Sequence, residues 1–294
     1  MDLPDLTIVD DIGTLPVLPD WITSSRAETP ENVVFLSGAA LAHLHLVLAR
    51  YEMPQSLLRD RLVLQAAEAC MAVSGRPERT GDLRDALHLL RPGDLPGPAG
   101  ETYQCWRRMV ERPVSVKAVH RALPELDAAT IANRLDAGKG APITRAATVL
   151  ETVLMEAPRA DVAALILADA ALAQALGWEY LTPLLAVGLK RGDLRKREED
   201  LRQACHRAVT ASAIAAARLA TDLARRAARL NAVAPKLRAK RAGQAVEMFQ
   251  TRDAVAPSAL PLPDRSARRL CDRLVELGAV RELTGRETFR LYGL

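Results

Sequence analysis

Residues 264–294 read DRSARRLCDRLVELGAVRELTGRETFRLYGL, and this stretch predicts three pieces of secondary structure in a fixed order. Its first half is amphipathic, because apolar residues recur at helical spacing on one face: Ala267, Leu270, Cys271, Leu274 and Leu277. Gly278 follows, where a glycine commonly ends a helix. Residues 280–283 and 288–292 are candidate strands around a Thr-Gly turn. A helix followed by a two-stranded wing is the order of parts in a winged helix-turn-helix.

The charges of this stretch favour a polyanionic partner. Three arginines crowd the start of the helix, where an isolated helix prefers acidic side chains by a few tenths to about 1 kcal/mol each. A recognition helix that presents its N-terminal half to the major groove needs that arrangement. The surplus is modest, since residues 264–294 hold seven Arg against five Asp and Glu. We therefore predict DNA contacts for Arg265, Arg268, Arg269 and Arg273 in the helix and for Arg286 and Arg290 in the wing.

A second basic stretch lies just upstream, with no acidic residue between Asp222 and Glu247. Phosphate contacts from such a run would make DNA binding strongly salt-dependent. The alternative is a solvated helix face without a partner. The candidate phosphate contacts are Arg225, Arg226, Arg229, Lys236, Arg238, Lys240 and Arg241.

The composition predicts an all-α body. With 294 residues the chain is long enough for two domains. Hydrophobic residues make up 49% of it, which excludes wholesale disorder, but aromatics make up only 3%. Leu, Ala and Val must therefore fill the core, and Ala and Leu are strong helix formers. The formal net charge of +4 is too small to indicate a polyanion partner by itself.

Apolar periodicity and helix-ending residues divide the chain into three parts. Residues 1–28 are expected to form an irregular arm, 29–245 an all-helical domain and 246–294 a winged-helix-like domain. Thr29-Pro30-Glu31 is a strong helix start. In the long helix, small residues along the apolar seam would allow a close approach of another helix. Further helices are predicted at 54–73, 82–90, 98–111, 114–123, 127–135, from 144, and at 161–176, 180–189, 194–233 and 236–250.

The residue types that perform chemistry are present but not in productive patterns. His43 and His45 are two apart on a helix and point to different faces, and neither Asp85 with His88 nor Cys205 with His206 completes a known site. No catalytic residue, metal site or cofactor is therefore predicted, and we expect a protein that is not an enzyme. The four cysteines form no Cys-x-x-Cys pair and are expected to be small buried side chains in a reducing compartment: Cys70, Cys105, Cys205 and Cys271.

A cytoplasmic location without membrane contact is expected. The acidic start, Met1-Asp-Leu-Pro-Asp, lacks the basic-then-apolar order of a signal peptide. The most apolar stretch, 162–178, is interrupted by Asp169 and Gln174, so it is typical of a buried core helix.

Several segments, spread over most of the chain, are distinctive when taken together. They are Arg26-Ala-Glu-Thr, Leu36-Ser-Gly-Ala-Ala-Leu, Asp85-Ala-Leu-His-Leu-Leu-Arg-Pro-Gly-Asp, Pro96-Gly-Pro-Ala-Gly, Gly177-Trp178 with Pro183-Leu-Leu-Ala, and 268–286. Together they resemble an uncharacterised family of bacterial proteins of about 300 residues, catalogued as a domain of unknown function. The resemblance implies a helical protein and supplies no catalytic residues. The last segment is also similar to winged-helix tails of modular bacterial proteins.

Two hypotheses follow. The first is a non-enzymatic DNA-binding protein, of the transcriptional-regulator type, whose helical body dimerises or binds an effector. The alternative is a helical interaction or scaffold protein whose winged helix packs against protein rather than DNA. The second hypothesis predicts that Arg268 and Arg269 pair with carboxylates of the body.

Overall fold

The computed structural model describes residues 16–24, 29–50, 53–90, 93–137, 139–237 and 241–294. Residues 20–237, which we call the body, are all-α as the composition predicts. The body helices are α1 (Asp20–Ser24), α2 (Pro30–Leu48), α3 (Gln55–Val73), α4 (Thr80–His88), α5 (Gly97–Val110), α6 (Val116–Ala122), α7 (Ala128–Asp136), α8 (Pro142–Glu156), α9 (Asp161–Ala175), α10 (Leu185–Gly188) and α11 (Glu198–Val233), with 3₁₀ turns η1 (Asp193–Arg195) and η2 (Ala234–Lys236).

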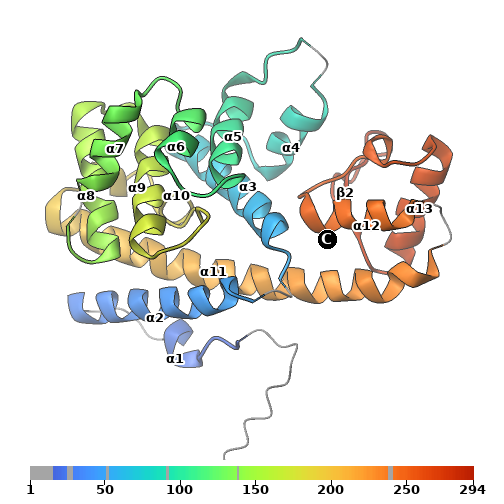
Figure 1. Ribbon diagram of the computed structural model, residues 1–294, viewed down its shortest axis with the longest axis horizontal. Coiled ribbons are helices and arrows are strands. Elements are labelled where there is room, and N and C mark those ends of the chain that lie inside the picture. The colour runs from blue at the N-terminus through green and yellow to red at the C-terminus, as the bar shows by residue number, and fades with distance from the viewer. Residues whose placement is uncertain (1–15, 25–28, 51–52, 91–92, 138, 238–240) are drawn as a thin grey trace, which may run out of the picture.

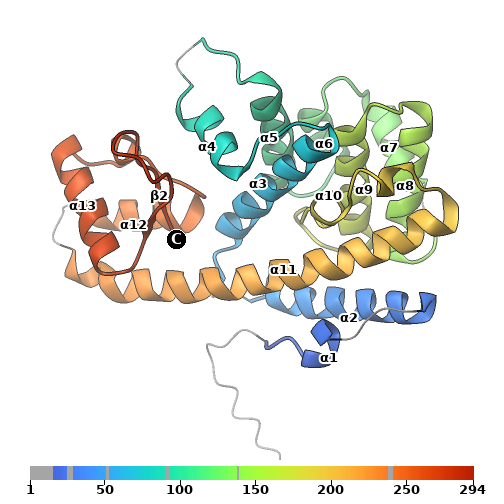
Figure 2. The ribbon, with the colours of Figure 1, turned by 180° about the vertical axis from the view of Figure 1, so that it is seen from behind.

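The long helix α11 sets the length of the molecule. Its 36 residues span about 54 Å at 1.5 Å per residue. The helix α2 lies along its first half, and α3 to α10 pack on its other side (Figures 1 and 2). Residues 241–294, which we call the tail, sit over the far end of α11 next to α3 and α4. Residue 246, where the sequence places a domain boundary, lies inside the first tail helix.

Leucine and alanine fill the core, as expected from the scarcity of aromatic residues. Ten of the fifteen residues of α9 are buried, so this helix lies at the centre of the body. Small residues on α11 allow α10 to approach closely. A Cβ added at Gly188 of α10 would lie 2.5 Å from the backbone oxygen of Ala208 in α11. The small-residue seam predicted in the long helix is therefore used for a close helix contact.

The helix α2 begins where the sequence predicts. The Thr29 side chain accepts a hydrogen bond from the Asn32 backbone N–H, and Pro30 occupies the first turn. Among the described helices, only α2 is long and apolar enough to cross a membrane by length and composition. In this structure one of its faces is buried against α11.

Residues 180–189 are predicted as a helix, but only Leu185–Gly188 (α10) is helical. Pro183 disfavours a helical conformation at the residue before it. The buried carboxylate of Asp169 then accepts hydrogen bonds at 2.8–3.0 Å from the N–H groups of Leu184, Leu185 and Ala186. Asp169 therefore fixes the start of α10 from inside α9.

The N-terminal arm, expected to be irregular, contains a helix among its described residues. In α1 the Ile22 side chain is buried. Trp21 stacks on Phe35 of α2, with ring centroids 5.5 Å apart. An aromatic contact thus packs α1 onto α2. Residues 1–15 and 25–28 lie outside the described part of the chain.

The tail contains two α-helices and two very short strands. It comprises α12 (Ala242–Thr251), the 3₁₀ turn η3 (Pro257–Ala259), α13 (Asp264–Glu276), β1 (Arg281–Glu282) and β2 (Tyr292–Gly293). The strands are antiparallel, and Val255 adds one bridge to Tyr292.

Each strand has two residues, so the longer strands predicted at 280–283 and 288–292 are wrong in extent. The Glu282 carboxylate accepts hydrogen bonds from the N–H groups of Thr284 and Gly285, which form a tight turn. Phe289 has a φ of +56°, which is incompatible with strand geometry.

Candidate nucleic-acid interface

The helix α13 forms as its sequence predicts. Its buried side chains are the predicted apolar face, Ala267, Leu270, Cys271 and Leu274. Gly278 ends the helix with a φ of +62°, the left-handed conformation that favours glycine. These features hold the opposite face of the helix toward solvent.

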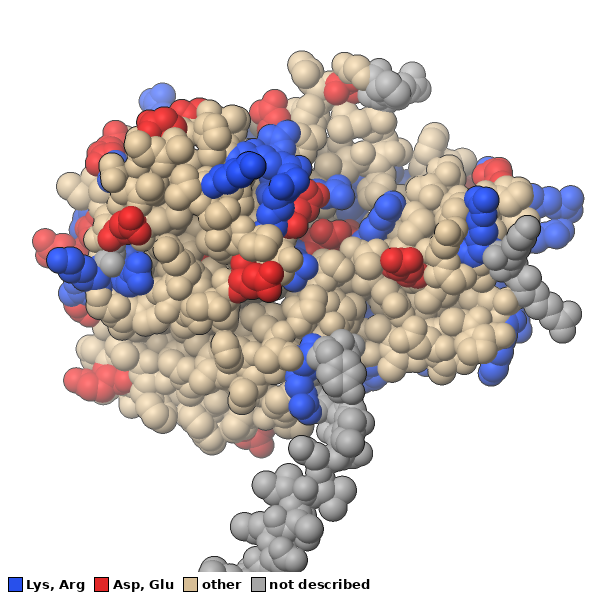
Figure 3. Space-filling view, in the orientation of Figure 1, with Lys and Arg blue, Asp and Glu red and all other residues tan. Residues whose placement is uncertain are grey.

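Three arginines share that solvent-facing side. Arg265, Arg269 and Arg273 stand four residues apart, so their side chains leave the helix at intervals of about 6 Å along one stripe. All three are exposed. Arg273 pairs with Glu276 at 3.0 Å, while Arg265 and Arg269 make no ion pair within the described residues. Figure 3 shows basic side chains gathered at this end of the molecule, over α13 and the end of α11.

Arg268 lies on a different side of α13. It pairs with Asp264 at 3.0 Å, and both residues line a groove of about 920 Å³ together with Asp272 and residues 287–292. The groove runs between α13 and the end of α4. The structure thus separates Arg268 from the other three arginines of the helix.

One of the two arginines of the predicted wing contacts the body of the same chain. Both terminal nitrogens of Arg286 donate to the carboxylate of Asp85 in α4, with Nη1 at 3.0 Å from Oδ1. Arg290 Nε donates to the backbone oxygen of Arg286 at 2.9 Å, inside the same segment. Arg286 therefore holds the predicted wing segment against α4. Arg268 and Arg269, which the packing hypothesis pairs with body carboxylates, make no such pair within the described residues.

The second basic stretch is divided between internal and exposed roles. Arg226 pairs with Asp222 at 2.7 Å, and Arg229 Nη2 donates to the backbone oxygen of Leu277 at 3.2 Å. The side chain of Arg225 is 75% exposed and reaches Asp222 only at 3.8 Å. Lys236 and Arg241 are also exposed, while Arg238 and Lys240 lie outside the described residues.

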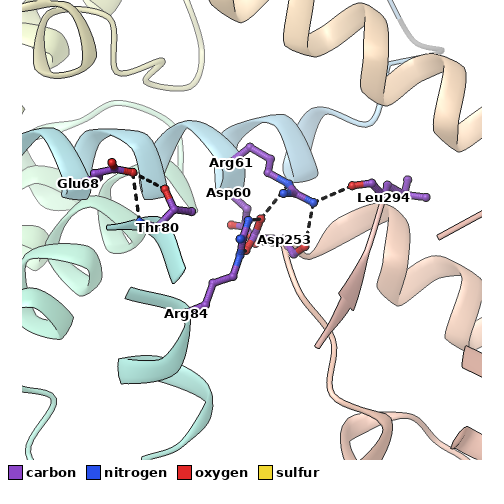
Figure 4. A network of polar contacts seen from close by, with 7 residues as sticks. All are labelled: Asp60, Arg61, Glu68, Thr80, Arg84, Asp253 and Leu294. Carbon is purple, nitrogen blue, oxygen red and sulfur yellow. Dashed lines mark hydrogen bonds and ion pairs between the residues drawn. The ribbon is translucent and has the colours of Figure 1, made fainter. Parts of the chain in front are cut away.

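A buried carboxylate, Asp253, joins the tail to the body (Figure 4). Arg84 of α4 donates to both of its oxygens at 2.6 and 3.0 Å, and Arg61 Nε of α3 lies 2.8 Å from Oδ1. Arg61 Nη2 also donates to the backbone oxygens of Asp253 and Leu294 at 3.2 and 2.8 Å. The side chains are 7–13% exposed, so water weakens these contacts little.

This junction was not predicted from sequence. Asp253 is separated from its partners by 169 to 192 positions, and a single Arg-Asp dipeptide after a helix carries no signal of a long-range contact. Only the fact that Asp253 follows an apolar helix hinted that it lies near buried residues.

The histidines and cysteines for which the sequence predicts no catalytic role make contacts inside the protein. Trp178 Nε1 donates to His45 Nδ1 at 2.9 Å, and the Ser37 hydroxyl lies 2.7 Å from His206 Nδ1. Burial lowers the pKa of His206 and raises the pKa of Cys205 to about 12, which leaves both groups uncharged at neutral pH. All four cysteines are free, as predicted, and Cys105 is half-buried rather than buried.

The chain was compared with known proteins. A search of curated proteins found no match. Residues 7–294 match the model of a family described as "Protein of unknown function (DUF1403)", which agrees with the resemblance seen in the sequence. Since the match covers nearly the whole chain, the protein belongs to that family.

Proposed function

We propose that the protein is a non-enzymatic DNA-binding protein and that α13 lies against the duplex. The observation that carries this proposal is the exposed stripe of Arg265, Arg269 and Arg273, which faces away from the buried side of its helix. Arginine binds phosphate and guanine through paired hydrogen bonds, and a major groove about 12 Å wide admits one helix. An arginine row on an exposed helix fits both requirements.

The order of elements in the tail supports a reduced winged helix. A winged helix runs as a helix, a short strand, a second helix, a recognition helix and a two-stranded wing. The tail runs as α12, the bridge residue Val255, the turn η3, α13 and the pair β1–β2. In this proposal η3 replaces the second helix and α13 is the recognition helix. The assignment rests on fold-level analogy.

The contacts of individual arginines assign them different roles. Arg265, Arg269 and Arg273 reach the groove or its phosphates, and the exposed Arg225, Lys236 and Arg241 add phosphate contacts at the end of α11. Arg286 is occupied by Asp85 and positions the wing instead. DNA binding then uses the helix and not the wing.

The proposal is tested with a fluorescently labelled duplex and two salt concentrations, about 50 and about 200 mM, where phosphate contacts dominate the difference. Replacing Arg265, Arg269 and Arg273 together by Glu should weaken binding by roughly tenfold or more at the lower salt. The dependence of log affinity on log salt should also become less steep by about three, one for each lost phosphate contact.

A matched control carries the same change of charge at the other end of the molecule. Lys117 in α6, Arg159 after α8 and Lys190 after α10 are all exposed. These three helices lie at the other end of the molecule from α13 (Figure 1). Their replacement by Glu should leave most of the affinity in place. Absence of binding by the unmodified protein at low salt, or equal losses in both variants, would overturn the proposal.

A second function, protein packing by the tail, is favoured by one specific observation. Arg286 pairs with Asp85 and Arg229 holds Leu277, so the tail already binds its own body. In this alternative, the groove between α13 and the end of α4 binds a protein partner. The arginine stripe of α13 then faces solvent and binds nothing. Two results together would favour this alternative: the unmodified protein binds no DNA, and it binds a protein partner.

A further inference from the structure

A cleft of about 610 Å³ lies where the body meets the tail. Its walls come from α3, α4 and α5 of the body and from residues 252–259 of the tail, and Asp253 of the junction lines it. Volumes of this size are typical of sites for small molecules. The cleft is separate from the arginine stripe of α13, because none of its lining residues belongs to that helix.

The cleft carries more positive charge than its own carboxylates neutralise. Five arginines line it: Arg84, Arg107, Arg108, Arg121 and Arg252. Arg84 is neutralised by Asp253. Arg107 and Arg121 share one carboxylate, Glu111, at 3.0 and 3.6 Å.

Two arginines of the cleft form no ion pair with the described part of the chain. Arg108 donates a hydrogen bond to the neutral side chain of Gln104, at 3.4 Å. Arg252 is exposed and forms no ion pair within the described residues. These two side chains come from α5 and from the tail, so they face one space from two parts of the chain. In Figure 3 basic side chains gather over α5, at the body side of this region.

Two polar groups inside the cleft, Tyr103 and Asp60, also have hydrogen-bonding capacity that the described residues do not use. Tyr103 is 4% exposed, and its hydroxyl makes no hydrogen bond to the part of the chain that the structure describes. Asp60 accepts one long hydrogen bond, 3.4 Å from the Asp253 backbone N–H. Burial raises the pKa of Asp60 to about 6, while the positive charge of Arg107 opposes that rise. The Tyr103 hydroxyl can therefore donate to a ligand in the cleft, and burial disfavours a negative charge on Asp60.

We propose that this cleft binds a small multivalent anion, with carboxylate or phosphate groups held by Arg108, Arg252 and the Arg107–Arg121 pair and with Tyr103 donating a hydrogen bond. Guanidinium groups match carboxylate and phosphate equally well in geometry. The size of the cleft and the three carboxylates that line it suit a small anion better than a nucleic-acid duplex. A bound anion bridges α5 and residue 252, so it stabilises the docked tail by the free energy of its binding.

Calorimetric titration at constant ionic strength tests this with three probes and no DNA. Citrate and pyrophosphate are multivalent, and acetate is the monovalent comparison. Saturable binding of citrate alone identifies a polycarboxylate site, and binding of pyrophosphate alone identifies a phosphate site. Binding of both also supports the proposal. Failure of both multivalent anions to bind, or binding of acetate with equal affinity, would overturn it.

Variants locate the site. Replacing Arg108 and Arg252 together by Gln should weaken anion binding tenfold or more, whereas Lys117→Gln with Arg159→Gln should leave it unchanged. Asp60→Asn should strengthen binding, because it removes a negative charge beside the ligand. That gain cannot arise from misfolding. Equal affinities in all three variants would show that the anion binds elsewhere. Since no duplex is present, these outcomes are independent of the proposed DNA binding.

Discussion

Burial disfavours the charged form of the Asp60 carboxyl group, and neighbouring groups offset this effect only in part. Its pKa is raised from an ordinary value of 3.8 to about 6, mainly by burial and in smaller part by Asp253 and Glu111. Arg107 and the Asp253 backbone N–H act in the opposite direction. The native state therefore holds this proton at pH values where the unfolded chain has released it. The free energy of unfolding must then fall as pH rises from about 4 to about 6.

Because the unfolding free energy falls with rising pH, we can predict the effect of Asp60→Asn in the absence of added ligand. At pH 8 the carboxylate is charged in both states, so the substitution removes the cost of burying that charge. We expect a gain of about 1–3 kcal/mol in unfolding free energy, from a shift of about two pKa units. At pH 4 the gain should vanish. Urea denaturation at pH 4, 6 and 8 measures it.

The exposed Asp136 provides the comparison for that experiment. Asp136→Asn should change stability by less than about 0.5 kcal/mol at each pH, because neither charge state is buried. A gain from Asp60→Asn that is the same at all three pH values would show that the carboxyl group titrates normally.

At the scale of elements, the approach of α10 to α11 depends on Gly188. A Cβ there would lie within 2.5–2.8 Å of the Ala208 backbone oxygen, carbonyl carbon and Cα. Backbone atoms cannot turn aside as a flexible side chain can. We expect Gly188→Ala to lower the unfolding free energy by about 1–3 kcal/mol, the usual cost of overpacking.

The same substitution at Gly38 should have the opposite sign. Gly38 lies in the middle of α2, is exposed, and would place its Cβ with nothing within 4 Å. Alanine there should stabilise the protein by about 0.5–1 kcal/mol through helix propensity. Thermal melts of the two variants check both signs. A stabilising Gly188→Ala would show that α10 and α11 are further apart than the structure places them.

Helix positions were predictable where a local signal sets them. The Thr29 cap and the apolar face of α13 lie where the sequence places them, because caps and periodicity depend on neighbouring residues. The α10 prediction is wrong because Asp169, 15 to 17 positions away, binds the N–H groups that begin it. Strand lengths in the tail are also set by a side chain, Glu282, whose role becomes visible only once the turn has formed.

The candidate sites divide in the same way. Arg265, Arg269 and Arg273 could be placed on one exposed stripe from their spacing alone. The cleft could not, because Arg108 and Arg252 are brought together by the docking of the tail and not by any sequence pattern. Sequence reasoning therefore named the arginines of one helix, without separating Arg268 from the stripe, and missed the cleft that two parts of the chain make together.

For the whole molecule, the attachment of tail to body rests on Asp253. Among the described residues it is the one carboxylate that two mostly buried arginines share, and removing its charge leaves both guanidinium groups without compensation. Breaking a buried pair of this kind costs about 3–5 kcal/mol. The exposed Arg286–Asp85 pair joins the same two parts, but such pairs are worth about 0–1 kcal/mol. The two contacts should therefore differ greatly in their effect on docking.

Hydrogen exchange measures that difference directly. In Asp253→Asn we expect faster exchange at the tail amides that hold the small sheet, those of Val255, Leu283 and Tyr292. Amides of α9 should keep their protection, because the core of the body does not depend on the tail. Arg286→Ala should leave both sets nearly unchanged. If the two variants loosen the tail equally, the Arg286–Asp85 contact holds it as firmly as the buried junction. If Asp253→Asn exposes α9 as well, body and tail unfold as one cooperative unit.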